Sequence, residues 1–327
     1  MDKKESIDTR MVSGMQNTIT QNNIPIIFFH RGNQKYLNVA LKQCRKFNEK
    51  VILLGDDSNR ETAFQNECDW IEAQTYDNGE MWRKFEKNYV SMSTNDYFFE
   101  LNCFRRFFVI AEMIREKDID QFVYLDSDIM SYVNFSSLDE MWKADCGMSV
   151  PIEQSQYGWV ANCGISFWNR KSLTSFLDYC IDIYENHIDV LEEKWNYHRK
   201  NHVDGGICDM TLQYLWYKND QTCKKINLVD RKNGLPGVMD FNVNLPMNCY
   251  KNEYQMNDLV HIKKICFENG KPYLCSTDGA KVPVFAIHFL GPAKQYMKSY
   301  EKNNSLGLSD YIIYYLKKFK VFLRRFR

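Results

Sequence analysis

The 327-residue sequence predicts an α/β fold, in which a mostly parallel central sheet is flanked by helices. A strand–helix–strand pattern early in the chain predicts a βαβ unit with parallel strands and a right-handed crossover. Two aspartates directly follow a buried strand near the middle of the chain, and a histidine ends a late strand. Ligands of such sheets bind beyond the carboxyl ends of the strands, so these residues indicate a ligand site there.

The composition is that of a globular protein without a strong net charge. Hydrophobic residues make up 44% and charged residues 26%, and the formal net charge is zero. Such a balance gives no general attraction to nucleic acid, so we expect no nucleic-acid partner. Apolar runs are shorter than the roughly 20 residues of a spanning helix. Residues 1–23 lack the apolar core of a secretory signal, and we expect them to be a disordered lead-in.

The 11 cysteines occur at irregular spacings and include no C-x-x-C pair. A disulfide framework or a structural zinc site would show closer, patterned spacing. Cys103, Cys180 and Cys208 lie among apolar neighbours, which is typical of small core residues. We therefore expect free thiols and a cytoplasmic protein.

The first βαβ unit begins after the polar N-terminal segment. Residues 24–29 predict a strand, with Pro25 near its start, where a missing backbone donor is tolerated. The residues that follow predict a turn over 30–33, a helix over 34–47, a second strand over 50–54 and a polar turn over 55–59.

Apolar residues recur at helical spacing over residues 104–116, which predicts a helix with Arg105 and Arg106 in its first turn. The positive potential of unpaired amides is highest there, so arginines do not stabilise that end of a helix. They would suit an anion, and a solvated pair that contacts loop carbonyls is the alternative. Residues 60–100 give no clear pattern.

The second half of the chain predicts a less regular set of elements. No internal repeat or low-complexity linker divides it, so we expect one domain over residues 24–308. The expected elements are strands over 147–151 and 164–168, a helix from a Ser172 cap to residue 186, a polar segment over 186–200 that is a solvated helix or a mobile excursion, a helix that starts near Asp204, and a strand over 284–290 that ends in a Gly-Pro turn.

The central motif is Asp126-Ser127-Asp128, which follows a predicted buried strand. In an extended segment residues i and i+2 point to the same side, so both carboxylates can face one point. Converging carboxylates repel each other unless a cation or a proton lies between them, and a hard divalent ion that also bridges phosphate oxygens fits this position. Asp-Ser-Asp is also ordinary turn chemistry, so a surface turn is the alternative.

His288 ends a predicted strand and is followed by Gly291 and Lys294 at fixed spacing. Imidazole suits manganese or another transition ion better than magnesium. Gly291 permits close backbone approach, and Lys294 offers a point charge for phosphate. A histidine in an apolar strand is by itself more often a packed core residue. Together with the two aspartates, however, the spacing describes a metal-bound diphosphate.

On residues 124–128 and 288–294, the sequence resembles the GT-A glycosyltransferases. It looks most like the retaining family that includes bacterial lipopolysaccharide galactosyl- and glucosyltransferases and glycogenin, glycosyltransferase family 8. The resemblance extends from residue 24 to about residue 300. It implies a GT-A fold and transfer of a hexose from a nucleotide sugar, UDP-galactose or UDP-glucose, with retention of configuration. The implied acceptor is a lipid-linked or cell-surface glycan such as lipopolysaccharide, capsule or exopolysaccharide.

The resemblance also implies ligands for the metal and the diphosphate. Asp126, Asp128 and His288 would bind Mn²⁺ or Mg²⁺, with Asp126 also touching the nucleotide. Gly291 and Lys294 would hold the diphosphate of the donor.

The remaining donor contacts would come from three other segments. Asn162 with Gly164 matches an Asn-x-Gly element beside the donor sugar. Arg106, rather than Arg105, matches an arginine that contacts sugar or phosphate. The turn that would line the nucleoside contains His30, Gly32 and Asn33.

The chain departs from the family pattern at two places. Cys208-Asp209-Met210 stands where the family often has Asp-Gln-Asp, and Gln295-Tyr296 replaces a frequent Pro-Trp. Asp209 maps to the first acid, but the missing Gln removes the usual residue near the anomeric carbon. Asp209, or another carboxylate opposite the leaving group, could stabilise the cationic sugar centre. With Asn162 it forms the candidate catalytic pair, and the donor sugar cannot be copied from any member of the family.

Residues 309–327 predict a basic amphipathic helix. Such a helix is suited to lie on an anionic bilayer, where each basic residue contributes about 1 kcal/mol, so we expect peripheral binding at the inner face of the cytoplasmic membrane. A helix docked on the protein's own core is the alternative. The apolar face would hold Ile312, Leu316, Phe319, Leu323 and Phe326, and the basic face Lys317, Lys318, Lys320, Arg324, Arg325 and Arg327.

Two other functions compete with the glycosyltransferase interpretation. A haloacid-dehalogenase-like phosphatase also uses Asp-x-Asp at a strand end, but its motif lies on the first strand and a Thr or Val normally follows two residues later. Here Met130 holds that place and two predicted strands come earlier. A catalytically silent membrane-surface scaffold would keep the basic tail and need no metal.

Overall fold

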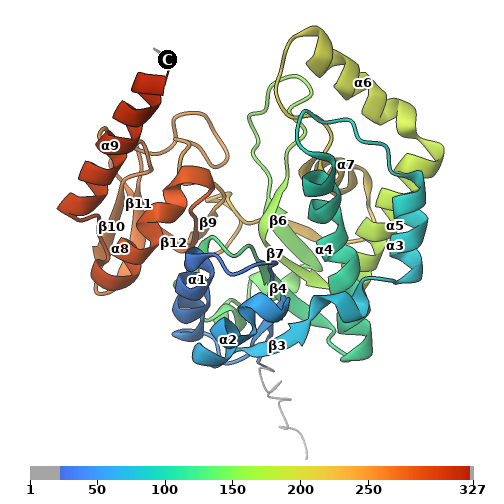
Figure 1. Ribbon diagram of the computed structural model, residues 1–327, viewed down its shortest axis with the longest axis horizontal. Helices are drawn as coiled ribbons and strands as arrows, with labels where there is room; N and C mark the ends of the chain where they lie inside the picture. The colour runs from blue at the N-terminus through green and yellow to red at the C-terminus, as the bar shows by residue number, and fades with distance from the viewer. Residues whose placement is uncertain (1–22, 325–327) are drawn as a thin grey trace, which may run out of the picture.

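The computed structural model describes the backbone of residues 23–324 and, within them, the side chains of residues 23–316 (Figure 1). The expected disordered lead-in therefore lies outside the described residues, apart from Asn23. Of the tail, residues 309–316 are described in full and residues 317–324 as backbone only.

A seven-stranded sheet with the order β3-β2-β1-β4-β7-β6-β8 lies at the centre of the chain. β1 runs parallel to both β2 and β4, β2 runs parallel to β3, and β7 runs antiparallel to β4 and β6. The mainly parallel sheet flanked by helices is thus confirmed. Its strands are β1 (Ile26–Phe29), β2 (Val51–Gly55), β3 (Asp69–Glu72), β4 (Gln121–Leu125), β6 (Cys146–Ser149), β7 (Asn162–Asn169) and β8 (Lys225–Asn227).

A second sheet has the order β10-β11-β12-β5, and β9 runs parallel to β12 beside it. β5 follows β4 along the chain after a three-residue link and pairs antiparallel with β12, where Ile129 lies opposite His288. The link that carries the two aspartates therefore joins the two sheets. The strands are β5 (Ile129–Ser131), β9 (Val238–Asp240), β10 (Ile265–Glu268), β11 (Lys271–Cys275) and β12 (Lys281–His288).

Helix α4 (Tyr97–Glu116) begins seven residues before the predicted start. The side chain of Asp96 accepts a hydrogen bond from the backbone N–H of Phe99 (3.0 Å), which is the usual role of an N-cap aspartate. Arg105 and Arg106 consequently lie in the middle of the helix. The prediction that they open it is wrong, and unpaired helical amides play no part in their environment.

Helix α5 (Arg170–Asn186) is capped by Asn169 and not by Ser172. Ser172 lies three residues further on and completes a capping box, since its Oγ accepts from the Asn169 N–H while its own N–H donates to the Asn169 side chain. Residues 188–200 form helix α6 (Ile188–Lys200), so this polar segment is helical. Helix α7 (Asp209–Asn219) starts five residues after the predicted position at Asp204.

Alternate residues of the central strands enter different cores. In β4, Val123 packs with helix α1 (Lys35–Arg45) on one face, whereas Tyr124 packs with α4 on the other. This alternation aims the Tyr124 side chain toward α4, which positions it for the site below. The other helices are α2 (Asp57–Gln65), α3 (Glu80–Asn88), α8 (Met297–Asn303), α9 (Leu308–Arg324) and the short 3₁₀ helices η1 (Ala73–Tyr76), η2 (Phe135–Ser137), η3 (Met141–Lys143) and η4 (Gly291–Tyr296).

Helix α9 docks on the second sheet's side of the molecule through part of its surface. Tyr311 and Tyr314 pack against the core, and the Tyr311 hydroxyl accepts a bond from Asn257 Nδ2 (3.4 Å). Ile312 and Leu316 point away from it and are 51% and 63% exposed. No helix in the described part of the chain has the length and apolarity needed to cross a membrane.

All 11 cysteines lie within the described residues and all are free. Seven of them are buried, Cys180 among them, whereas Cys103 and Cys208 are only partly buried.

Candidate active site

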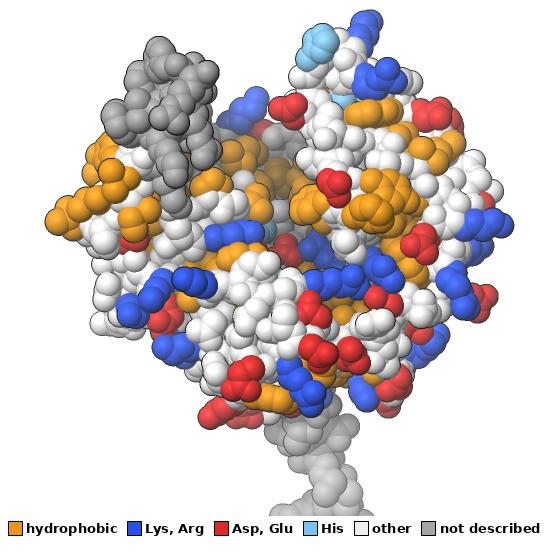
Figure 2. Space-filling model, in the orientation of Figure 1, with side chains coloured by type: hydrophobic (Ala, Val, Ile, Leu, Met, Phe, Trp, Pro, Cys, Tyr) orange, Lys and Arg blue, Asp and Glu red, His pale blue; other side chains and the backbone are white. Residues whose placement is uncertain are grey.

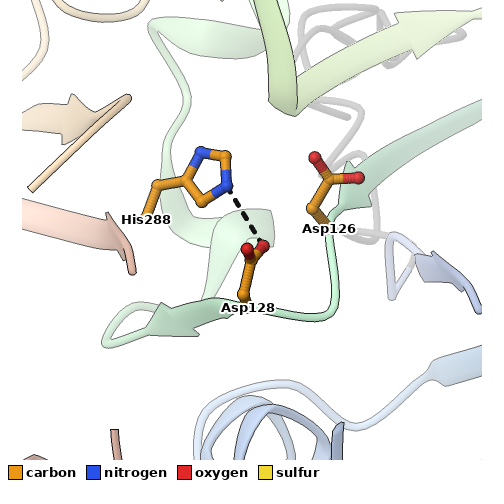
Figure 3. Close-up of side chains that lie close together, drawn as sticks. All are labelled: Asp126, Asp128 and His288. Carbon is orange, nitrogen blue, oxygen red and sulfur yellow. Dashed lines mark ion pairs between the residues drawn. The ribbon is translucent and has the colours of Figure 1, made fainter. Parts of the chain in front are cut away.

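Asp126, Asp128 and His288 lie together at the junction of the two sheets (Figure 3). Each contributes one possible ligand atom, and these atoms all lie within 4.8 Å of one another. The position of His288 follows from pairing, because β12 aligns it with Ile129 and the N–H of Phe289 donates to the Asp128 carbonyl (3.0 Å). The structure brings the three side chains together as the sequence analysis expected. Their role as metal ligands stays a prediction.

The donor set fits a divalent metal ion. Two carboxylates and an imidazole are ligands that Mn²⁺ and similar ions accept. His288 Nε2 lies 3.1 Å from Asp128 Oδ1, yet within the described residues neither ring nitrogen makes a hydrogen bond of good geometry. Burial would lower the pKa of His288, but the Asp128 carboxylate outweighs burial and raises it. A nitrogen that is buried, unbonded and aimed at a carboxylate is suited to a cation.

Gly164 of β7 leaves room for these ligands. A Cβ added there would lie 2.7 Å from Asp126 Oδ2 and 2.9 Å from His288 Cε1, closer than real Cβ contacts. The backbone also holds the site, because the Asp126 N–H donates to the Gly164 carbonyl (2.7 Å) and the Gly164 N–H donates to Asn162 Oδ1 (2.9 Å). Asn162 is 7% exposed and its Nδ2 lies 3.7 Å from Met210 Sδ.

Lys294 contacts the same carboxylate as His288. It follows Gly291, whose φ of +57° favours glycine, and its Nζ lies 3.1 Å from Asp128 Oδ2 and 4.7 Å from the centre of the Tyr36 ring. Burial would raise the pKa of Asp128, but His288 and Lys294 outweigh it and lower that pKa to about 2. Asp128 is therefore an anion that lies beside an imidazole and an ammonium group.

Arg106 joins a predicted metal ligand to the predicted catalytic acid. Its Nη1 lies 2.6 Å from Asp126 Oδ1 and its Nη2 lies 2.5 Å from Asp209 Oδ2. Asp209 is the first residue of α7 and is 3% exposed. Arg105 on the same helix instead pairs with Asp77 (3.0 Å). Of the two arginines, Arg106 is the one at the site, while its contact with a donor stays a prediction.

Ser127, which lies between the two aspartates, connects the first turn to the candidate site. The side chains of Ser127 and His30 lie 2.8 Å apart (Oγ to Nδ1), and the Gly32 N–H, at a φ of +86°, donates to Asp56 Oδ2 (2.7 Å). Asn33 is placed differently, because its Oδ1 accepts from Thr62 of α2 (3.0 Å). It lines a separate pocket of about 470 Å³ beside α1 and α8.

Tyr124 is a residue of the site that was not predicted from the sequence. Its hydroxyl donates to Asp126 Oδ1 (2.6 Å) and accepts from Arg106 (3.1 Å). Its signal was available, since Tyr124 precedes Asp126 by two residues on a strand and so points to the same side. A second pocket, of about 360 Å³, lies beyond β1, β2 and β3 and was also missed. Its lining consists of Arg31, Gly55, Asp56, Glu72, Ala73, Gln74 and Asp77.

Figure 2 shows a hollow in the middle of one face of the molecule, between the C-terminal part of the chain and the part that carries α6. Side chains of both charges gather at its floor. Acidic and basic groups side by side are what the contacts of Asp126, Asp128, Arg106 and Lys294 also show.

No protein-family model and no curated protein matches this chain. The glycosyltransferase GlyE of Streptococcus pneumoniae TIGR4 is 18% identical, with a TM-score of 0.31 over 60% of this chain and 44% of the GlyE chain. A glycosyltransferase involved in glycosylation of the major capsid of PBCV-1 is 12% identical, with a TM-score of 0.27 over 55% of this chain and 76% of the other.

A cytidylyltransferase from Leptospira borgpetersenii is 13% identical, with a TM-score of 0.32 over 54% of this chain and 73% of the other. The match to GlyE, by contrast, covers 44% of that chain, which is less than half of its length. TM-scores this low carry no argument about fold or activity. Functional inference for this chain therefore depends on its own residues and their geometry.

Proposed function

We propose that the chain is a metal-dependent glycosyltransferase that transfers a hexose from a nucleotide sugar to a glycan acceptor. The observation that supports this most is the meeting of Asp126, Asp128 and His288 within 4.8 Å, with Lys294 on the same carboxylate. A metal group with an adjacent lysine suits the diphosphate of a nucleotide sugar.

The charges of the site support a metal and a diphosphate bound together. The carboxylates of Asp126, Asp128 and Asp209 outnumber the permanent cations of Arg106 and Lys294 by one. Metal binding requires a neutral His288, so the net charge of these side chains is then minus one. A divalent ion reverses its sign, and the resulting positive site attracts a diphosphate anion.

Each side chain has a role in the proposed reaction. A bound metal ion would stabilise the negative charge of the departing nucleoside diphosphate. Lys294, which lies at Asp128, would hold a phosphate oxygen as that charge grows. Arg106 holds Asp209 and Asp126 in fixed positions, and Asp209 would face the sugar as positive charge develops at its anomeric carbon.

The donor is proposed to be UDP-galactose or UDP-glucose with Mn²⁺, and the configuration to be retained. These details rest on the resemblance of residues 124–128 and 288–294 to retaining GT-A enzymes. Proton NMR of the product, recorded before mutarotation, tests the stereochemistry through the anomeric coupling constant. A product with inverted configuration would contradict retention and leave the metal site unaffected.

The acceptor is proposed to be a glycan on a lipid carrier at the inner face of the cytoplasmic membrane. Helix α9 supports this, because Tyr311 and Tyr314 take the docking face while Ile312 and Leu316 remain exposed. The residues that follow, 317–327, include six Lys and Arg side chains by sequence. An exposed apolar face next to basic residues suits an anionic bilayer.

Thermal stabilisation by UDP in the presence of Mn²⁺ tests the proposal. We expect UDP with Mn²⁺ to raise the melting temperature, UDP with a chelator to have no effect, and Asp128→Ala to abolish the shift. Asp258→Ala, at an exposed acid in a turn, is the matched control and should keep it. An equal shift in Asp128→Ala would contradict the site.

A screen of nucleotide sugars for Mn²⁺-dependent hydrolysis then identifies the donor and separates an enzyme from a silent scaffold.

A further inference from the structure

Residues 150–161 join β6 to β7, and the loop 152–161 within this segment leads directly into Asn162 and Gly164 of the site. Two of its residues, Tyr157 and Trp159, have φ values of +55° and +41°. Bulky side chains rarely adopt this left-handed conformation, which persists only where the surroundings enforce it. The two rings lie with centroids 5.1 Å apart, and both side chains remain partly exposed.

Helix α6 supplies that enforcement. Lys194 is 2% exposed, and its Nζ donates to the Gly158 carbonyl (3.1 Å) and to Thr211 Oγ1 (2.9 Å) while lying 5.8 Å from the centre of the Trp159 ring. A buried ammonium is unfavourable unless it makes good hydrogen bonds, so the bonds of Lys194 hold the loop in place. On the same helix, Tyr197 packs on the Tyr157 ring at 4.9 Å and Glu193 accepts from the Tyr157 hydroxyl.

The loop is also fixed from within and at its end. Gln154 donates to the carbonyls of Pro151 (2.8 Å) and Val160 (2.9 Å) and accepts from the Val160 N–H (2.7 Å). The Ala161 N–H donates to the carbonyl of Met210 (3.1 Å), the residue after Asp209. The two aromatic rings are therefore held at a defined place relative to the proposed catalytic acid.

We propose that Tyr157 and Trp159 form a stacking platform for a sugar ring of the acceptor glycan. Rigid aromatic faces bordered by a few polar groups are typical of sites that bind ligands with both apolar and polar surface. Trp159 is three residues and Tyr157 five residues from Asn162, so their backbones lie at most about 11 Å and about 18 Å along the chain from the proposed donor site. The inference rests on the proposed function and assigns the acceptor side of the same site.

A glycan fits this platform better than a lipid chain does. Glu193 lies at the edge of the Tyr157 ring and Lys194 beneath Trp159, so the surroundings of the rings carry charge and hydrogen-bonding groups. A sugar presents a C–H face to an aromatic ring and hydroxyls to such neighbours. An acyl chain would cover the exposed Glu193 carboxylate and take it out of water, which is unfavourable.

Binding of the full chain to an array of defined oligosaccharides, with UDP and Mn²⁺ present, tests the platform. The variants are Tyr157→Asn and Trp159→Asn, because asparagine tolerates the left-handed conformation of both positions. We expect each to lower glycan binding at least tenfold and to leave the UDP affinity within twofold. Phe64→Asn, at an aromatic residue of α2 that is 52% exposed, is the control and should bind as the unsubstituted chain does.

Lys194→Met is a further variant that keeps both rings and removes their support. We expect it to weaken glycan binding with UDP affinity unchanged. Unchanged glycan binding in both asparagine variants would overturn the platform, as would an unsubstituted chain that binds UDP with Mn²⁺ but no glycan. A chain that does not bind UDP with Mn²⁺ at all would overturn the proposed function together with the platform, so the two failures are distinguishable.

Discussion

At the scale of single residues, Gly164 shows how little space surrounds the proposed metal ligands. A methyl group there would meet Asp126 at 2.7 Å and His288 at 2.9 Å, and both of those side chains are held by other contacts. Neither neighbour is the free end of a flexible surface chain. A substitution at Gly164 must therefore displace a ligand atom, even though the residue makes no side-chain contact of its own.

We expect Gly164→Ala to weaken Mn²⁺-dependent UDP binding at least tenfold, because it separates the Asp126 carboxylate from the His288 ring. Isothermal titration calorimetry measures the change. Gly307→Ala is the control, since the nearest atoms to its Cβ would be 3.7 Å away. Equal UDP affinity in Gly164→Ala and Gly307→Ala would show that Asp126, Asp128 and His288 do not bind one metal ion together.

A second prediction concerns the buried ion pair of Arg106 and Asp209. Removing one partner of such a pair leaves an unpaired buried charge, and we expect Arg106→Met to reduce the free energy of unfolding by about 3 kcal/mol. Adding Asp209→Asn should recover part of that loss, because it removes the stranded carboxylate. Urea unfolding of the single and double variants measures both effects. Additive losses would mean that the two side chains do not interact in solution.

The sequence predicted that Asp126, Asp128 and His288 form one site because short spacings mark these residues. Asp126 and Asp128 follow a buried strand two residues apart, although the structure places them in a turn, where the Ile129 N–H donates to the Asp126 carbonyl (3.1 Å), and not in an extended segment. His288 is marked by the glycine and lysine that follow it. The environment of Arg106 could not be predicted, because its partner Asp209 lies 103 residues away and only the fold brings them together. Asn33 was assigned from its place in the first turn, but the bond to Thr62 depends on how α2 packs.

At the scale of elements, local signals failed where tertiary contacts decide the structure. The start of α4 was missed because its first turn, with Phe98 and Phe99, is apolar yet 69% and 60% exposed, so it lacks the amphipathic pattern of a surface helix. The polar sequence of α6 does not by itself distinguish a solvated helix from a mobile excursion. Its buried contacts include Lys194, a residue type that sequence patterns place on the surface.

Helix α6 gives a prediction about pH. Burial lowers the pKa of Lys194 from 10.5 to about 8, and the neighbouring Cys208 acts in the opposite direction without cancelling this effect. His198 and Thr211 also face the Lys194 ammonium group. Between pH 8 and 10.5 the unfolded chain binds a proton that the folded chain has lost. The free energy of unfolding should therefore rise with pH in this window, by up to about 1.4 kcal/mol per pH unit from this residue.

Lys194→Met should remove this contribution, and chemical denaturation at several pH values from 7 to 10 measures the slope. Lys200→Met, at an exposed position of the same helix, should keep the slope of the unsubstituted protein. Identical slopes in the two variants would show that Lys194 titrates normally.

Helix α9 gives a prediction about membranes. Because Tyr311 and Tyr314 dock on the core, a chain that ends at residue 316 should stay folded. We expect it to lose co-sedimentation with vesicles of anionic phospholipid, while the full chain binds them and binds less at high salt. Replacement of the basic tail residues by Gln in the full chain should have the same effect, and these are Lys317, Lys318, Lys320, Arg324, Arg325 and Arg327.

Co-sedimentation that is unchanged in the shortened chain would show that the tail is not the membrane contact. Binding that persists in the Gln variant but is lost on shortening would assign the contact to apolar residues of the tail. Vesicles of neutral phospholipid serve as the control for charge.

At the scale of the whole molecule, the proposed metal site joins two sheets. Asp126 follows β4 of the seven-stranded sheet, Asp128 precedes β5 of the other, and His288 ends β12. The parallel first sheet could be predicted from its βαβ signal. The second sheet could not, because β5, β9 and β10 are three or four residues long and form only by pairing with distant strands.

A ligand held by both sheets should stabilise both. We expect Mn²⁺ with UDP to slow amide hydrogen exchange in β5 and β12 as well as in β4, with a stabilisation of about 2.7 kcal/mol at a ligand concentration 100 times the dissociation constant. Hydrogen–deuterium exchange with mass spectrometry measures this, and Asp128→Ala should show no such protection. Slower exchange confined to residues 30–33 would place the nucleotide away from the sheet junction.

Two features described above differ in how well they should tolerate substitutions. They are the link between β4 and β5 and the support of loop 152–161 by α6. The first tolerates little, since its three residues serve a register shared by two sheets. The support of loop 152–161 depends on α6, and the exposed positions of this helix other than Glu193 do not hold the loop. A laboratory selection for altered specificity should therefore yield more tolerated substitutions along α6 than in the link.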